Sequence, residues 1–499
     1  MKIGSNNEIL KSTCIGVLAL AALICWLQFQ PRLPNSEPKE AIGRPLFENF
    51  SDPSQMRKIE FVGIDPASGE TRRLTLVRNE NDAQWRLPDM SNFPAENADR
   101  LAKVVAPLTQ LAALDVIDEP VRDKDSSAID KFHRECGLLS PSKFIPDLDG
   151  KAEARKTDEE SQEEEKNLAK GSATSVKIEG KSGETLVDLL IGNRLPESAA
   201  TRDARYVRFP NDDVVYTVDF SGDSTQEVGT TEFTEFPARV SYEPIDWIDR
   251  DLLRISRWDV LFLTTRDYAF NLTKQDDQTF VRNDFNQVGI EVFRQTPENS
   301  LSRVWSLERR FDYSAESASW QEASNVDPES AQNDVLNETA DALGRLKIVD
   351  VRKKPDALVA LFHEGRVGAE LTTQLETLGE FGFATLDYDP LDPKRVEPFL
   401  VGEGGTVEIA TREGVKITLV FGKKFDDKRA CLAYASFDRK SLEESTEDET
   451  ELVFLATDAE KKAVVKNDRF AEWFYFIAEE DYQSVRFRSA QTLKVPDAQ

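Results

Sequence analysis

Residues 175–194 read SVKIEGKSGETLVDLLIGNR, and residues 406–425 read TVEIATREGVKITLVFGKKF. In each stretch apolar and polar residues alternate before a turn near Gly183 or Gly414, and the second strand ends at Gly192 or Gly422. Alternation with a period of two is typical of half-buried β-strands, and glycine suits the turn between them. Each stretch is therefore predicted to form an antiparallel hairpin, so the chain contains two similar hairpins.

The segments around the two hairpins also recur in the same order. Upstream of each lies a tryptophan in similar surroundings, in AQWRLPDMSNFPAEN (residues 83–97) and in ASWQEASNVDPESAQ (residues 318–332). We expect Trp85 and Trp320 to be core residues that fill the seam between a three-stranded sheet and the helix that follows. Tryptophan, helix, glycine hairpin and tyrosine strand in fixed order predict an internal duplication.

Four further pairs of segments fit the same alignment. They are VWSLERR (304–310) with LTLVR (74–78), LAALDVI (111–117) with LGRLKIV (343–349), CGL (136–138) with FGF (381–383), and YVRFPNDDVVYTVDF (206–220) with YASFDRK (434–440) and LVFLATD (452–458). The helix of the first copy is expected to begin near Pro94, a residue tolerated in a first helical turn. Its apolar face has helical spacing, and Pro107 is expected to kink or shorten it.

These patterns predict an α+β protein: an N-terminal transmembrane helix followed by two tandem, internally repeated lobes of antiparallel sheet plus helix. Two acidic insertions are expected to be disordered excursions, because they contain few apolar residues. The expected parts are a cytoplasmic N-terminus (1–11), the transmembrane helix (12–29), a stalk (30–56), the first lobe (57–220, with an acidic insertion at 147–171), a linker (221–253), the second lobe (254–490, with an additional hairpin at 266–300 and an acidic insertion at 441–451), and a C-terminal tail (491–499).

The membrane segment, STCIGVLALAALICWLQF at residues 12–29, carries no charge. At about 1.5 Å rise per residue its length approaches the ~30 Å thickness of the hydrocarbon layer. Lys2 and Lys11 precede it, so we expect a single-pass protein with a cytoplasmic N-terminus and an extracytoplasmic, periplasmic body. A cleaved signal peptide is the alternative, although no small-x-small pair ends the run near Trp26.

Charge and cysteine content narrow the class of protein. The chain has 91 Asp and Glu against 63 Lys and Arg, a net charge of −28, which repels phosphate backbones and argues against nucleic-acid binding. Cys136 and Cys431 are the only cysteines outside the apolar N-terminal run. We favour two buried free thiols over a disulfide between them.

Known catalytic motifs are not found. The two histidines, His133 and His363, are too few for a multi-histidine zinc site, and each is expected to be a surface or satisfied core residue. Gly180-Lys181-Ser182 lacks the preceding glycine of a phosphate loop and is read as a turn. We therefore predict no catalytic, cofactor-binding or metal residues and no cofactor, and we favour a protein that is not an enzyme.

An aromatic run, RFAEWFYFIAEEDY at residues 469–482, has two readings. Phe470, Trp473, Phe474 and Ile477 have helical spacing, whereas WFYFI equally fits a buried strand. In either case core packing is favoured over a platform for a glycan or a partner.

The apolar anchor, the strand-strand-tryptophan-helix unit and a progression of G-L, V-x-I, G, L-x-I-G, Y-V and V-Y-x-V in residues 137–218 resemble one bacterial family. This is the domain of unknown function 4340 family, whose members are typically membrane-anchored and found with gliding-motility-type ABC transporter components. The resemblance covers residues 57–220 well and 254–490 more loosely, and the family has no established catalytic residues.

The resemblance implies an extracytoplasmic accessory or scaffold protein that works beside an ABC-type transport system and contacts its permease or ATPase. Two alternatives stay open. A cell-envelope glycan hydrolase would use a pair of carboxylates, which 91 acidic residues make easy to find. A ligand-binding receptor would need a pocket between the lobes.

Overall fold

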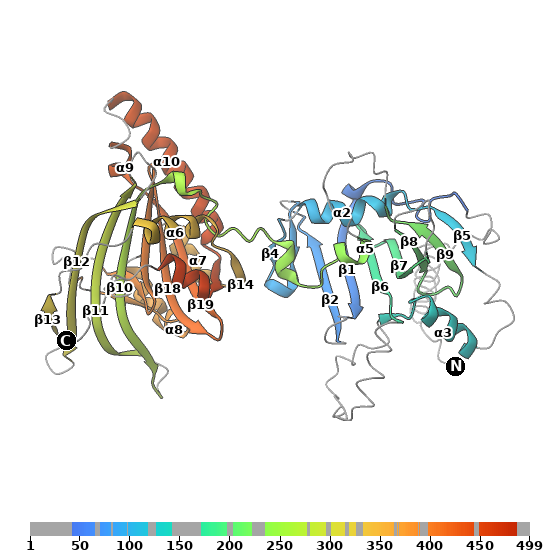
Figure 1. Cartoon of the computed structure of the whole chain (residues 1–499), viewed down its shortest axis with the longest axis horizontal. Coiled ribbons are helices and arrows are strands. Elements are labelled where there is room, and N and C mark those ends of the chain that lie inside the picture. The colour runs from blue at the N-terminus through green and yellow to red at the C-terminus, as the bar shows by residue number, and fades with distance from the viewer. Residues whose placement is uncertain are drawn as a thin grey trace, which may run out of the picture. The chain divides into compact units, whose positions relative to one another are not determined.

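The chain divides into two compact units, Met1–Asp249 (unit 1) and Arg250–Gln499 (unit 2), each with its own sheet and helices (Figure 1). Both units are of the α+β class, and their sheets are largely antiparallel. The computed structural model describes residues 42–64, 70–80, 83–96, 98–117, 126–141, 171–196, 203–221, 235–276, 280–295, 301–314, 319–325, 333–363, 367, 369–387, 389, 398–443 and 449–486.

Unit 1 is built on a nine-stranded sheet with the order β4-β3-β2-β1-β6-β7-β8-β9-β5. Apolar residues of neighbouring strands meet on its buried face, where Phe61 lies opposite Leu74 and Ile59 opposite Leu76. Its elements are β1 (Met56–Ile64), β2 (Thr71–Arg78), β3 (Trp85–Leu87), β4 (Phe93–Pro94), α2 (Ala98–Thr109), β5 (Ala113–Ile117), α3 (Ser126–Glu135), β6 (Thr174–Gly180), β7 (Thr185–Arg194), β8 (Ala204–Arg208), β9 (Val215–Asp219) and α5 (Phe236–Arg239).

Unit 2 has a second nine-stranded sheet, strongly curved in Figure 1, with the order β13-β12-β11-β10-β17-β18-β19-β20-β14. A separate two-stranded sheet, β15-β16, belongs to this unit alone among the described residues. Its elements are β10 (Val260–Lys274), β11 (Phe280–Gln295), β12 (Leu301–Ser314), β13 (Ser319–Asn325), α6 (Asn333–Gly344), β14 (Ile348–Lys353), α7 (Asp356–His363), α8 (Leu375–Glu380), β15 (Phe383–Leu386), β16 (Phe399–Gly402), β17 (Gly405–Thr411), β18 (Val415–Phe425), β19 (Lys428–Phe437), α9 (Arg439–Glu443), α10 (Glu449–Phe470), β20 (Trp473–Ala478) and α11 (Glu479–Val485).

The two sheets have the same strand order, position by position, with four strands before the first helix and five after it. The predicted hairpins are confirmed as β6–β7 and β17–β18. Their turns contain Gly183 at φ +80° and Gly414 at φ +76°, in the left-handed region that favours glycine. The stretches that suggested the duplication therefore occupy equivalent places in the two sheets.

The strand order corrects three parts of the predicted alignment. The described residues of the predicted additional hairpin, 266–276 and 280–295, belong to the hairpin β10–β11, which takes the place of β1–β2 and is therefore not additional. VWSLERR lies in β12, the counterpart of β3 rather than β2, and Trp320 lies in β13, the counterpart of β4. The predicted alignment was shifted by one strand because equivalent strands differ greatly in length. Strands β3 and β4 have three and two residues, whereas β12 and β13 have 14 and 7.

The second acidic insertion is not a disordered excursion where the structure describes it. Residues 441–443 end α9, and residues 449–451 begin the 22-residue helix α10. LVFLATD lies inside α10, so its match to a strand was wrong, and the strand that follows is β20. Unit 1 joins β8 to β9 through the short segment at residues 209–214, so α9 and α10 have no counterpart there.

Two boundaries also differ from the prediction. Helix α2 begins at Ala98, because Pro94 still pairs with Arg86 in the sheet, and Pro107 lies inside α2 near its end. Residues 235–248, predicted as linker, pack into unit 1, where Phe236 and Trp247 are buried. Large aromatic side chains supply enough apolar area to hold such a segment against a sheet.

The predicted transmembrane helix at 12–29 and residues 147–170 of the first acidic insertion lie outside the described residues. Within the described ranges, no helix is both long enough and apolar enough to cross a membrane.

Candidate functional site

A groove of about 420 Å³ in unit 1 lies between α2 and one end of the sheet. Its walls are mostly apolar and come from β1, β2, β3, the first two turns of α2, and a segment after α5. The lining residues are Pro53, Ser54, Met56, Leu76, Arg78, Trp85, Ala95, Ala98, Leu101, Ala102, Val105, Ala106 and Trp247.

Two tryptophans form the aromatic part of this groove, and they differ in burial. Trp85 on β3 lies at the predicted seam between the sheet and α2, but it is only partly buried there and lines the groove. The buried tryptophan is Trp247, which is 1% exposed, stacks on Phe61 with ring centroids 5.5 Å apart, and donates its indole N–H to the Ser241 carbonyl. No local pattern around Trp247 indicates this role, because Trp247 reaches the sheet from a segment far along the chain.

Among the residues that the structure describes, Arg78 is the one ionisable side chain that lines the groove. Its Nε donates to the carbonyl oxygen of Ala83 at 2.9 Å, and its Nη1 donates to that of Ser54 at 3.2 Å. The guanidinium thus ties two loops at the rim of the groove. A partly exposed aromatic ring in a mostly apolar hollow suits the binding of an apolar group, and no proton-transfer pair is found among the described lining residues.

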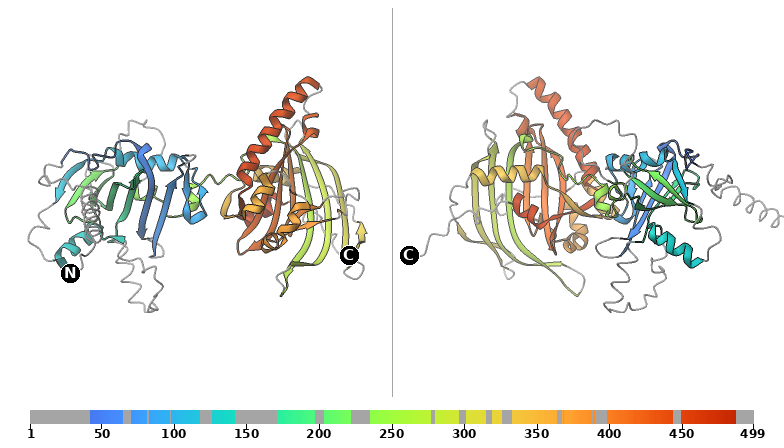
Figure 2. Two further views of the ribbon diagram at one scale, coloured as in Figure 1. Left: turned by 180° about the vertical axis from the view of Figure 1, so that it is seen from behind. Right: turned by 45° about the vertical axis from the view of Figure 1, so that its right-hand side comes forward.

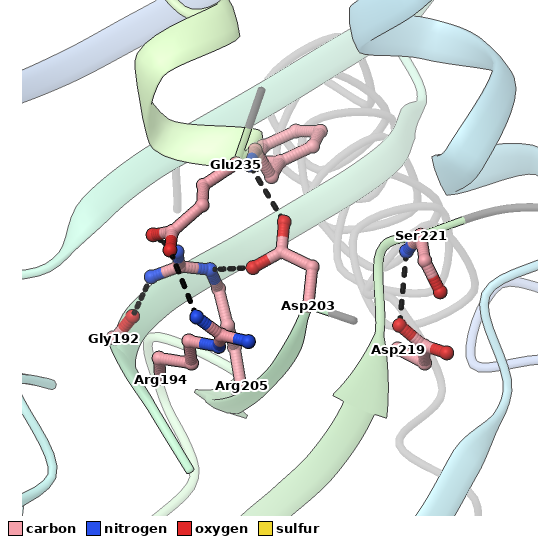
Figure 3. Close-up of polar contacts among 8 residues, drawn as sticks. Gly192, Arg194, Asp203, Arg205, Asp219, Ser221 and Glu235 are labelled. Carbon is pink, nitrogen blue, oxygen red and sulfur yellow. Dashed lines mark hydrogen bonds and ion pairs between the residues drawn. The ribbon is translucent and has the colours of Figure 1, made fainter. Parts of the chain in front are cut away.

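A cluster of charged residues surrounds Arg205, a residue of β8 in unit 1 (Figure 3). Arg205, which is 5% exposed, donates to the carboxylate of Asp203 at 2.6 Å, to Glu235, and to the carbonyl of Gly192 at 3.3 Å. Arg194 also contacts Glu235, at 3.2 Å. Two carboxylates therefore converge here, but both are paired with guanidinium groups, Asp203 with Arg205 and Glu235 with Arg205 and Arg194, which is a structural arrangement rather than a hydrolytic pair.

This cluster holds the segment that carries Trp247. The second carboxylate oxygen of Asp203 accepts the backbone N–H of Phe236 at 2.7 Å, at the start of α5. Phe236 also stacks on Phe220, with ring centroids 4.3 Å apart. Since the chain continues from α5 directly to Trp247, the cluster and the stack together fix the position of one wall of the groove.

Unit 2 contains a matching cluster around Arg429 on β19. Arg429 donates to the carbonyl of Gly422 at 2.8 Å and, through two nitrogens, to both carboxylate oxygens of Glu479 at 3.0 and 3.1 Å. Glu479 begins α11, which follows the strand β20 just as α5 follows β9. The guanidinium also lies 3.9 Å from the ring centroid of Tyr482 in α11.

The two glycines of these clusters have the same second contact. The N–H of Asn193, next to Gly192, donates to the carbonyl of Cys136 at 2.8 Å, and the N–H of Lys423, next to Gly422, donates to that of Phe381 at 2.8 Å. A Cβ atom on Gly192 or on Gly422 would overlap those carbonyl oxygens. The predicted match of CGL with FGF is thus confirmed: each segment packs against the end of its own hairpin.

The histidines behave as the sequence predicted. His133 is buried and its Nε2 lies 3.0 Å from the carbonyl of Asp213, which as an acceptor requires the proton on Nε2. Burial lowers the pKa of His133. His363 lies at the surface, with Nδ1 3.2 Å from the carboxylate of Asp468. Among the described residues, no group of three or more histidine, cysteine, aspartate or glutamate side chains is placed to hold a metal ion.

Other expected features fall within packed structure. Ser182 lies in the β6–β7 turn, where its N–H donates to Glu184, so the Gly-Lys-Ser sequence is the predicted turn. Residues 473–478 of the aromatic run form the strand β20, with Trp473 and Phe474 buried, while Phe470 ends α10 and Tyr482 lies in α11, both also buried, which confirms core packing. Cys136 and Cys431 are buried free thiols, and burial raises the pKa of Cys136 to about 11.

Lys354 is a buried lysine that the sequence did not single out. It is 2% exposed, and its Nζ donates to the carbonyls of Phe470 at 2.9 Å and Ala471 at 3.0 Å, at the end of α10. The ring centroid of Phe362 lies 3.9 Å from Nζ. Burial holds the pKa of Lys354 well below its usual value of 10.5. The side chain satisfies carbonyl groups that a helix end leaves without partners.

Replacing Lys354 with methionine is expected to change the pH dependence of unit 2 stability. Between the lowered native pKa and about 10.5, the unfolded chain binds a proton that the folded chain does not. The stability of the natural protein therefore gains up to about 1.4 kcal/mol per pH unit as pH rises through this window, and the variant lacks that contribution. Urea unfolding of both proteins from about pH 7 to 10 measures the difference. Parallel stability curves would contradict the assignment.

No family model matches the chain, and no curated protein or solved structure matches it either.

Proposed function

We propose that this chain is a membrane-tethered, extracytoplasmic accessory protein of an ABC-type transport system, as its resemblance to the domain of unknown function 4340 family implies. In this proposal residues 12–29 are the single membrane anchor, with the N-terminus in the cytoplasm. The two units form a binding scaffold without catalytic activity of their own.

The observation that carries the proposal is the groove in unit 1. Its two tryptophans and the alanine-rich face of α2 offer an apolar hollow large enough for one or two side chains of a partner protein. Tryptophan in a pocket with a polar rim is typical of sites that contribute most of the binding energy in protein interfaces. We therefore propose that the groove receives an apolar segment of the permease.

The two units are proposed to derive from one ancestral unit by duplication. The support lies in equivalent contacts as well as equal strand order. In unit 1, Arg205 lies opposite Arg194 in the sheet and donates to the carbonyl of Gly192, two residues before Arg194. In unit 2, Arg429 lies opposite Lys424 and donates to the carbonyl of Gly422, two residues before Lys424. Unit 2 then differs by the added helix α10 and the β15–β16 sheet.

Site-specific photocrosslinking in native membranes tests the proposed function. A photoreactive amino acid at Ala102, which lines the groove, is expected to capture a permease subunit, identified by mass spectrometry. The matched control is Lys103, the next residue of α2, which is exposed and does not line the groove. Equal capture from both positions, or a partner unrelated to transport, would count against the proposal.

Trp85→Ala is expected to lower the crosslinking yield from Ala102 at least tenfold. Removing the half-buried ring takes away apolar contact worth about 1.4 kcal/mol or more of binding free energy. Thermal unfolding should change less than in Trp247→Ala, which should cost about 3–5 kcal/mol of stability, because Trp85 is only partly buried and Trp247 is 1% exposed. An unchanged crosslinking yield in Trp85→Ala would show that the partner does not use the groove.

A further inference from the structure

Helix α10 presents an apolar stripe to solvent. Val453, Phe454, Val464 and Val465 are 68%, 74%, 57% and 68% exposed. The two pairs are eleven residues apart, which is about three turns of an α-helix, so all four side chains lie on one side. Large apolar residues that cluster on an exposed face are a mark of interaction surfaces. We call these four residues the α10 stripe.

The opposite face of α10 is firmly fixed to the sheet. Ala459, Ala463 and Phe470 are buried, and Asn467 binds both backbone groups of Ala435 in β19, accepting from its N–H at 2.7 Å and donating to its carbonyl at 2.8 Å.

Within β19, only residues 428–431 pair with strand β20. Beyond them, at Ala435, the side-chain amide of Asn467 makes the hydrogen bonds that a neighbouring strand would otherwise make. The end of α10 is held by Lys354. The stripe is thus presented on a rigid element.

Figures 1 and 2 show α10 rising beyond the ends of the strands of unit 2. The helix is an addition to a strand order that unit 1 completes with a short turn. The sheet therefore does not depend on the outer face of α10, and the exposed valines and phenylalanine of this face contribute nothing to the core.

Charge around the α10 stripe distinguishes the class of partner. Glu449 lies one turn before Val453 and Glu460 one turn before Val464, both exposed. Asp468 and Lys461 lie within the same arc, and Glu451 and Asp458 lie along the other edge, so acids outnumber bases around the stripe. The whole chain carries −28, which attracts cations over long distances and opposes close approach of a second copy.

We propose that the α10 stripe docks an amphipathic helix of a partner protein, with an apolar row bordered by lysine or arginine. Two helices that pack along such a stripe bury the valines and the phenylalanine, and the basic borders face Glu449 and Glu460. The surface belongs to unit 2 and is independent of the groove in unit 1 and of the transporter assignment.

The test uses the full-length protein and a synthetic helical peptide with leucine along one face and lysine on both borders. The natural protein is expected to bind this peptide at least tenfold more tightly than the double variant Phe454→Ser, Val464→Thr, measured by fluorescence anisotropy. These substitutions change no charge, so the loss reports the apolar contact. The matched control, Leu375→Ser in α8, removes another exposed apolar side chain of unit 2 and should leave binding unchanged.

Two further peptides isolate pattern and charge. A peptide of the same composition in scrambled order, and one with glutamate in place of lysine, should each bind at least tenfold more weakly. Glu449→Gln with Glu460→Gln should weaken binding of the lysine peptide and reduce its dependence on salt.

Three outcomes would overturn the proposal. One is equal binding by the Phe454→Ser, Val464→Thr variant. Another is a dimer of the natural protein that this variant loses in sedimentation, which would make a second copy the occupant. The last is binding to phosphatidylcholine vesicles that depends on the same two residues.

Discussion

Replacing Arg205 with methionine is expected to destabilise unit 1 by about 3–5 kcal/mol. The substitution leaves the carboxylate of Asp203, which is fully buried, without the guanidinium at 2.6 Å. A buried charge that loses its partner is strongly destabilising, because it has neither water nor an opposite charge near it. Urea unfolding of the full-length protein, followed through tryptophan fluorescence, measures the loss.

Arg194→Met is the matched control, since Arg194 contacts the same Glu235 but both side chains are about half exposed. Exposed ion pairs contribute about 0–1 kcal/mol, so this variant should be close to the natural protein. A second variant, Arg205→Met with Asp203→Leu, removes both charges and should recover much of the stability. Equal losses from Arg205→Met and Arg194→Met would refute the role given to the buried pair.

Gly422→Ala is expected to cost unit 2 about 3–4 kcal/mol. The added methyl group would overlap the carbonyl oxygen of Phe381, which is backbone and cannot turn aside as a flexible side chain could. The segment that carries Phe381, between α8 and β15, must move away from β18, which adds the cost of overpacking to a weakened hydrogen bond from Lys423. Gly192→Ala should have the equivalent effect in unit 1, because the carbonyl of Cys136 occupies the same place.

Gly183→Ala serves as the control for steric overlap. No atom lies within 4 Å of a Cβ built there, but φ is +80°, so only the conformational penalty of about 1–2 kcal/mol applies. Thermal unfolding of the three variants ranks them. If Gly422→Ala were no more destabilising than Gly183→Ala, the close approach of the Phe381 carbonyl would not be a constraint on the fold.

The hairpins could be predicted from the sequence because their determinants are local. Strand alternation and a glycine at positive φ are written within about twenty residues, and Gly183 and Gly414 fall where the pattern changes direction. The alignment failed by one strand between residues 260 and 325, where long strands pair with partners that local patterns do not specify.

The helical spacing of α10 can be recognised only over a long window of sequence. LVFLATD looks like a strand over a short window, because four consecutive apolar residues suit either structure. Over a longer window Ala459, Ala463, Asn467 and Phe470 repeat at intervals of four, four and three residues, which is helical spacing and marks the buried face.

The groove and the arginine clusters lay beyond sequence reasoning for a different reason. Trp247 contacts Phe61, and Arg205 contacts Gly192 and Glu235, across stretches of chain that share no local pattern. Arginine and aspartate are common in so charged a sequence, so neither residue type distinguishes a buried pair from a solvated one.

The shared strand order of the two sheets creates a hazard during synthesis. A nascent strand of unit 2 meets a folded template with its own topology, and repeated architectures are prone to exchange of equivalent segments. Unequal strand lengths oppose such hybrids: β11 has 16 residues against 8 in β2, and β10 has 15 against 9 in β1. In a sheet that mixed strands of both units, a large part of each long strand would have no neighbour. The difference in strand length therefore favours pairing within each unit over pairing between the units.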